Sequence, residues 1–162
     1  MRKSAAGRAI AAAGAGKIRC IGRNTAVSVK EVSQMKRIAK DESKCIGCRS
    51  CENACSMAYY KKQDPQLSCI RITDLPDGGH HIAACNQCGI CASVCNTVVI
   101  RPNPKGVYML NKKECAGCLM CVGFCPQDVM VHAEGALEPS KCTSCGLCVK
   151  ACPTGAIWME EV

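Results

Sequence analysis

A twelve-residue cysteine unit occurs four times in this chain of 162 residues and constrains its fold more than any other feature. Each unit has the spacing C-x2-C-x2-C-x3-C, and together the units hold sixteen of the eighteen cysteines. The units read CIGCRSCENACS at 45–56, CNQCGICASVCN at 85–96, CAGCLMCVGFCP at 115–126 and CTSCGLCVKACP at 142–153. A repeat of this kind predicts a chain that folds around groups bound by thiolates.

The spacing of the unit is typical of ligands to iron–sulfur clusters. Three cysteines at i, i+3 and i+6 on a looping backbone can converge on one cubane, while the fourth points away and, in two-cluster ferredoxins, binds the other cluster. Structural zinc needs only four ligands, and disulfide frameworks belong mainly to secreted chains, so neither explains four complete units. The sequence therefore predicts four [4Fe-4S] clusters. The expected iron ligands are Cys45, Cys48, Cys51, Cys55, Cys85, Cys88, Cys91, Cys95, Cys115, Cys118, Cys121, Cys125, Cys142, Cys145, Cys148 and Cys152. Cys20 and Cys69 lack this spacing, and Cys69 is expected to be a small buried residue.

Short β-rich segments separate the units. Residues 67–83, 98–110 and 129–139 are each expected to form a hairpin, and the last residues of each unit are expected to open a short helix. One Trp and one Phe provide little bulk for a conventional core, so bound clusters should stabilise the chain instead. We predict an α+β fold of tandem bacterial-ferredoxin-like modules over residues 45–162.

Residues 1–44 are predicted to form a basic, Ala/Gly-rich N-terminal arm. They contain 11 Lys and Arg against 3 acidic residues, whereas residues 45–162 contain 10 of each. Apolar residues at helical spacing predict a short amphipathic helix over 29–40. The arm has no aromatic residue for base stacking, and anionic clusters offer its charge another partner, which argues against nucleic acid.

No segment resembles a signal peptide or a membrane span. The first twenty residues are interrupted by Gly, Lys and Arg, and no stretch approaches the roughly 20 apolar residues of a transmembrane helix. The sequence predicts an uncleaved cytoplasmic chain with no membrane span.

The four units over 45–153 resemble the four-cluster polyferredoxin subunits that connect molybdenum or tungsten oxidoreductases and related complexes. The segment 48–72, CRSCENACSMAYYKKQDPQLSCIRI, is similar to the first-cluster segment of that group. The plain spacing of Cys88 and Cys91 is more similar to the small subunits of tungsten aldehyde oxidoreductases and class II benzoyl-CoA reductases than to the dimethyl-sulfoxide-reductase branch.

Spacing alone leaves the pairing of units open, because units two and three or units three and four could each form an ordinary ferredoxin module. The resemblance implies a nested scheme, in which unit one pairs with four and two with three; the alternative is a tandem scheme. The nested ligand sets are Cys45, Cys48, Cys51 and Cys152; Cys85, Cys88, Cys91 and Cys125; Cys115, Cys118, Cys121 and Cys95; and Cys142, Cys145, Cys148 and Cys55.

The predicted function is electron transfer without catalysis, because the motifs provide no nucleophile with a base and no dinucleotide fingerprint. The resemblance implies a large catalytic oxidoreductase subunit, with a tungsten or molybdenum cofactor, as one partner and a flavin or ferredoxin-linked subunit as an acceptor. The alternative is a free soluble polyferredoxin that shuttles electrons between enzymes. The arm could also join two copies of the chain.

Two units lack the proline that usually follows the fourth cysteine. Ser56 and Asn96 occupy that place, whereas Pro126 and Pro153 follow the other two units. Because proline has no backbone N–H, the sequence suggests the hypothesis that Ser56 and Asn96 donate to the neighbouring thiolates and raise the potentials of those clusters.

Overall fold

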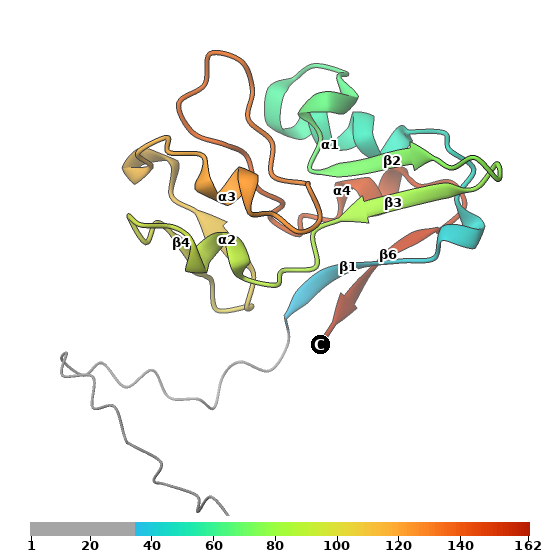
Figure 1. The fold of residues 1–162 in the computed structure, drawn as a ribbon. Helices are drawn as coiled ribbons and strands as arrows, with labels where there is room; N and C mark the ends of the chain where they lie inside the picture. The colour runs from blue at the N-terminus through green and yellow to red at the C-terminus, as the bar shows by residue number, and fades with distance from the viewer. Residues whose placement is uncertain (1–34) are drawn as a thin grey trace, which may run out of the picture.

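The computed structural model describes residues 35–162, which form two lobes of short helices and hairpins (Figure 1). The strands are β1 Lys36–Lys40, β2 Ile70–Asp74, β3 His80–Ala84, β4 Ile100–Pro102, β5 Tyr108–Leu110 and β6 Ile157–Glu161. The helices are α1 Ser50–Tyr60, α2 Ile90–Ser93, α3 Met120–Gly123 and α4 Leu147–Ala151, with 3₁₀ turns at Glu42–Lys44, Pro65–Leu67 and Lys112–Glu114. These small modules confirm the predicted α+β class.

The larger lobe joins the first and last parts of the described chain. Strand β1 pairs antiparallel with β6, β2 pairs antiparallel with β3, and α1 packs against α4. Ile72 and Ile82 are paired across the β2–β3 hairpin, and both are buried beside cysteines of units one and four. Units one and four therefore share one lobe, although units two and three lie between them in the sequence.

The smaller lobe contains units two and three. The β4–β5 hairpin pairs Ile100 with Leu110, and α2 packs against α3. Its core combines Ile100 and Met130 with Cys91 and Cys121, one cysteine from each unit. Figure 1 shows this lobe on the left, beside the lobe that contains α1 and α4.

The predicted amphipathic helix over 29–40 is wrong where the structure describes it. Residues Lys36–Lys40 form strand β1, whose partner β6 lies near the end of the chain. Ile38 is buried, and the basic residues beside it form ion pairs with β6, Lys36 with Glu161 and Arg37 with Glu160. Pairing with a distant strand has overridden the local pattern, so the folded domain begins before residue 45. Residues 1–34 of the predicted arm lie outside the described residues.

Two of the three predicted hairpins, β2–β3 and β4–β5, are confirmed. The third, over 129–139, is reduced to one bridge between Val131 and Ser140. Glu134, Gly135 and Pro139 disfavour strands, and Pro139 has no N–H to extend the ladder. The helices also begin earlier than expected, because each includes the third cysteine of its unit. Among residues 35–162 no helix is long and apolar enough to cross a membrane.

Candidate iron–sulfur site

Each cysteine unit curls through two left-handed residues at the same two positions. In unit one these are Gly47 at φ 67° and Arg49 at φ 57°, on either side of Cys48. The corresponding residues, all with positive φ, are Gln87 and Gly89, Gly117 and Leu119, and Ser144 and Gly146. Such residues reverse the course of the chain within a few atoms. The first three cysteines of a unit are therefore turned towards a common interior.

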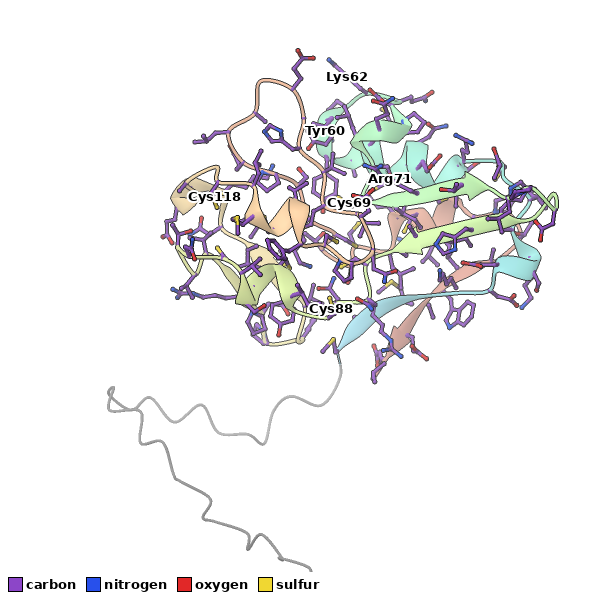
Figure 2. All side chains as sticks on the ribbon, viewed as in Figure 1. Tyr60, Lys62, Cys69, Arg71, Cys88 and Cys118 are labelled. Atoms are coloured by element: carbon purple, nitrogen blue, oxygen red, sulfur yellow. The ribbon has the colours of Figure 1, made fainter. Side chains whose placement is uncertain are left out.

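The third cysteine of each unit is buried and the second is exposed. Cys51, Cys91, Cys121 and Cys148 lie in the first turn of α1 to α4. Cys48, Cys88, Cys118 and Cys145 lie at the surface, and Figure 2 labels Cys88 and Cys118 in the smaller lobe. Each unit thus connects the interior of its lobe to the molecular surface.

Three cavities each bring three cysteines of one unit together with the fourth cysteine of another unit. The first cavity is lined by Cys85, Cys88, Cys91 and Cys125, and Cys142 also contributes to its wall. The second is lined by Cys45, Cys48, Cys51 and Cys152. The third is lined by Cys142, Cys145, Cys148 and Cys55.

The remaining four predicted ligands belong to the smaller lobe. Cys121 is buried in its core, and Cys95 packs against that core. Cys115 and Cys118 precede Cys121 in the loop before α3. Because α2 and α3 pack together, the end of unit two lies close to unit three.

The buried cysteines of both lobes suit a soft, cationic metal centre. Burial raises the pKa of Cys51 and of Cys142 to about 12, and that of Cys121 and of Cys148 to about 11. Such thiols stay protonated at neutral pH unless a metal displaces the proton. Thiolates in an apolar surrounding are the donors that iron–sulfur clusters take, so the residues fit the expected group.

The described cysteines are spread too widely to bind one ion together. Among residues 35–162 no three His, Cys, Asp or Glu side chains converge on a site for a single metal ion. A [4Fe-4S] cluster takes one cysteine at each of its four irons, so its ligands surround a larger volume than those of a single ion.

Cys69 is buried, as expected, but it also contacts a predicted ligand. Only 1% of its surface is exposed, and its backbone N–H donates to Cys55 Sγ at 3.3 Å. Hydrogen bonds from the Cys69 thiol and backbone lower the pKa of Cys55 to about 6 despite its burial. Cys69 thus favours the thiolate form of Cys55. Spacing could not identify this role, because Cys69 reaches Cys55 only through the packing of β2 against α1.

The hypothesis that Ser56 and Asn96 donate to cluster thiolates is not supported by the geometry. Ser56 lies inside α1, where its N–H belongs to the helical hydrogen-bond ladder. Its hydroxyl donates to the Asn53 carbonyl at 3.1 Å and accepts from the Asp64 N–H at 3.2 Å. For Cys95, the hydrogen bonds that lower the thiol pKa come from Thr97, Val99 and Ile100 rather than from Asn96, and they outweigh the effect of burial.

All four cysteine units lie within segments that match known families. Residues 42–58 and 136–158 match 4Fe-4S binding domains. Residues 84–130 match a 4Fe-4S dicluster domain, and this range contains units two and three.

Three relatives illustrate the range of similar proteins. The electron transport protein HydN of Escherichia coli is 33% identical over 105 residues, which cover 57% of each chain. A polysulfide reductase subunit of Wolinella succinogenes is 36% identical over 96 residues, 53% of this chain and 50% of the relative. The polyferredoxin-like subunit of aliphatic sulfonate oxidoreductase from Pyrococcus furiosus is 33% identical over 103 residues, 62% of this chain and 60% of the relative. The matched part of the chain thus spans 50–60% of the length of these relatives.

Among solved structures, a component of the active site complex BamBC of benzoyl coenzyme A reductase is 25% identical. The match covers 80% of this chain and 81% of that component, with a TM-score of 0.47 that is too low to establish a common architecture. The sequence matches show that this chain contains 4Fe-4S binding segments and is similar to an electron transport protein, a polysulfide reductase subunit and a polyferredoxin-like subunit.

Proposed function

We propose that the chain is an electron-transfer subunit that carries four [4Fe-4S] clusters in nested pairs of units. The observation that carries this proposal is the composition of the three cavities, each lined by three cysteines of one unit and the fourth cysteine of its nested partner. The proposed ligand sets are Cys45, Cys48, Cys51 and Cys152; Cys142, Cys145, Cys148 and Cys55; Cys85, Cys88, Cys91 and Cys125; and Cys115, Cys118, Cys121 and Cys95. The match of units two and three to a dicluster domain supports the inner pair.

The lobes suggest an order for the clusters. Units one and four share the larger lobe, and units two and three share the smaller one. Cys142 lines the same cavity as Cys85, which supports a contact between the unit-four and unit-two clusters at the lobe boundary. The clusters then follow the order one, four, two, three.

A bound [4Fe-4S] cluster supplies one-electron transfer. The residues of the chain hold each cluster, exclude water from its inner side and leave the second cysteine of the unit at the surface. Such a chain moves electrons and leaves substrate chemistry to a partner. The names of the relatives, an electron transport protein, a polysulfide reductase subunit and a polyferredoxin-like subunit, support this non-catalytic role.

The proposed partner is a large catalytic oxidoreductase subunit with a tungsten or molybdenum cofactor. Two of the relatives are named as parts of a polysulfide reductase and of an aliphatic sulfonate oxidoreductase, which supports a bound subunit over a free shuttle. Anaerobic purification of the native complex tests this choice. A co-purifying large subunit that contains either metal is expected, whereas a chain that purifies alone with all its clusters would favour the free polyferredoxin.

Cluster number and pairing are tested on the anaerobically prepared full chain. Iron and sulfide analysis should give four clusters per chain, and fewer than four clusters per chain would refute the proposal. For the pairing, Cys152→Ser and Cys48→Ser should alter the same EPR signal. Under tandem pairing, Cys152→Ser would instead alter the signal that Cys118→Ser alters. Cys69→Ser is the matched control, because it removes a buried cysteine that is not a proposed ligand. The serine hydroxyl and the backbone N–H can still donate to Cys55, so all four signals should remain.

A further inference from the structure

A buried lysine lies at the boundary between the two lobes. Lys141 precedes the first cysteine of unit four, and only 4% of its surface is exposed. Two hydrogen bonds connect its segment to helix α1. The Tyr59 hydroxyl donates to the Lys141 carbonyl at 2.6 Å, and the Tyr60 hydroxyl donates to Ser140 Oγ at 2.8 Å. The backbone of Lys141 is therefore anchored to the larger lobe.

The side chain of Lys141 reaches towards unit two. Its Nζ donates to Gln87 Oε1 at 2.8 Å and to the Cys142 carbonyl at 3.2 Å, and it lies 3.8 Å from Cys85 Sγ. Figure 2 labels Cys88 of the same unit in the smaller lobe. The ammonium group thus contacts a proposed ligand of the unit-two cluster directly.

Gln87 holds the ammonium group in place. This amide is 2% exposed, and its Nε2 donates to Ser144 Oγ at 3.0 Å and to the Cys142 carbonyl at 3.2 Å. Its Oε1 also accepts from the Tyr108 N–H at 3.2 Å. Because both ends of the amide are engaged, its orientation is fixed with the oxygen towards Lys141.

The charge of Lys141 has no carboxylate partner within the part of the chain that the structure describes, where the ion pairs involve other cations. A buried cation is costly unless an anion lies beside it. The groups that can supply negative charge here are the thiolates of units two and four.

We propose that Lys141 is the internal counter-ion of the unit-two cluster and raises its reduction potential above the value set by the cysteines alone. This inference rests on the proposed function. Reduction adds one negative charge to the cluster, and a fixed positive charge nearby stabilises that reduced form. The electron would come from the neighbouring unit-four cluster, and no bond would form or break. The buried lysine thereby favours transfer across the lobe boundary into unit two.

The test is a potentiometric titration of the full-length holoprotein followed by EPR, in which the unit-two signal is the one altered by Cys88→Ser. Lys141→Met removes the charge but keeps an unbranched side chain. The one-electron equilibrium constant for reducing the unit-two cluster should fall at least tenfold, a shift of about 59 mV or more to lower potential. Lys141→Arg restores a charge and should recover most of this shift.

Lys62→Met is the matched control, since the same substitution is made at an exposed lysine just beyond α1 (Figure 2). It should leave the unit-two potential unchanged, and an equal shift in this variant would overturn the proposal by showing an effect of net charge alone. An unchanged unit-two potential in Lys141→Met would overturn it as well.

A second variant keeps the test decisive if Lys141→Met loses the cluster. Gln87→Glu places a carboxylate against Nζ at nearly constant volume and should lower the same potential, and no shift in this variant would overturn the proposal. Failure of the proposed function can be distinguished from failure of this inference. The former would appear as fewer than four clusters in the unmodified chain, and the unit-two potential could still be compared between variants.

Discussion

The two positions that lack the expected proline should respond in opposite ways when proline is introduced. Ser56 and Asn96 both follow the fourth cysteine of a unit, but Ser56 lies in the interior of α1, whereas Asn96 lies in an exposed turn after α2. We predict that Ser56→Pro prevents assembly of the larger lobe and that Asn96→Pro is tolerated.

The expected loss at Ser56 has two parts. Proline in a helix interior removes a hydrogen bond and clashes with the preceding turn, which costs about 3 kcal/mol or more. The Ser56 side chain is completely buried and bridges Asn53 to Asp64, and two such hydrogen bonds contribute about 2 kcal/mol together. A loss of about 5 kcal/mol equals the whole net stability of many small domains, commonly about 5–15 kcal/mol.

The turn that contains Asn96 already has a proline-bearing counterpart. The Val98 N–H donates to the Cys95 carbonyl at 3.0 Å, and the Asp128 N–H donates to the Cys125 carbonyl at 3.1 Å. Pro126 occupies the place of Asn96 in that second turn. Asn96→Pro should therefore change the free energy of unfolding by no more than about 1 kcal/mol, in the stabilising direction.

The assay is anaerobic reconstitution of both variants, with cluster content measured by iron analysis and the loss of visible absorption followed in denaturant. Ser56→Ala separates the contributions, because it removes the side-chain bridge and keeps the helical N–H. Full cluster content and a wild-type denaturation midpoint in Ser56→Pro would refute this explanation of the missing proline, as would equal damage in the two proline variants.

Three further predictions concern strain, packing and cofactor dependence. Val98 is a β-branched residue with a left-handed backbone at φ 53°, and Asp128, at the same position after unit three, has φ 49°. Val98→Asp should relieve about 1 kcal/mol of backbone strain and raise the denaturation midpoint. A lower midpoint would contradict this. Tyr59→Phe removes the hydrogen bond to the Lys141 carbonyl and should cost about 1–3 kcal/mol in the same denaturant assay, whereas an unchanged midpoint would show that another donor replaces the hydroxyl. Removing iron with a chelator should abolish most of the far-ultraviolet circular dichroism, because thiols occupy much of both cores; a native spectrum without iron would contradict this.

The predictions that held depend on short stretches of sequence. The cysteine spacing requires a tightly curled loop in each unit, and the structure provides it through paired left-handed residues such as Gly47 and Arg49. The β2–β3 hairpin could be predicted because its turn residues and its alternating apolar residues lie within one segment. In both cases the determining interactions join residues close together in the chain.

The predictions that failed depend on distant partners. Residues 36–40 have one buried apolar residue, Ile38, among basic neighbours, and this pattern fits a helix or an edge strand equally well. The strand forms because β6 supplies both the backbone ladder and the acidic residues opposite Lys36 and Arg37. The prediction that Ser56 and Asn96 donate to thiolates failed for a related reason. The cysteine spacing does not show that α1 continues past Cys55, whereas α2, α3 and α4 end before the fourth cysteine of their units.

The contacts at the lobe boundary could not be predicted from the sequence for a different reason. A lysine before a cysteine unit resembles any solvated basic residue, and Lys141 becomes distinctive only when Gln87 and Cys85 are seen against it. Buried polar groups of this kind need every partner in place, because each unpaired group loses its hydration without compensation. Their identification therefore requires the packed structure.

Because the segments of the smaller lobe lie between those of the larger lobe in the chain, we expect a preferred order of assembly. Units two and three follow each other in the chain, so the smaller lobe can close from contacts of short sequence separation. The larger lobe needs α1 to meet α4 and β1 to meet β6, which joins the two ends of the described chain. Long-range pairings of this kind form slowly, because loop closure precedes their stabilising contacts. On the proposed pairing, Cys55 and Cys152 complete their clusters only when the larger lobe closes. The boundary formed by Lys141 and Gln87 then follows both lobes, so the inner clusters can be in place before the path between the lobes exists.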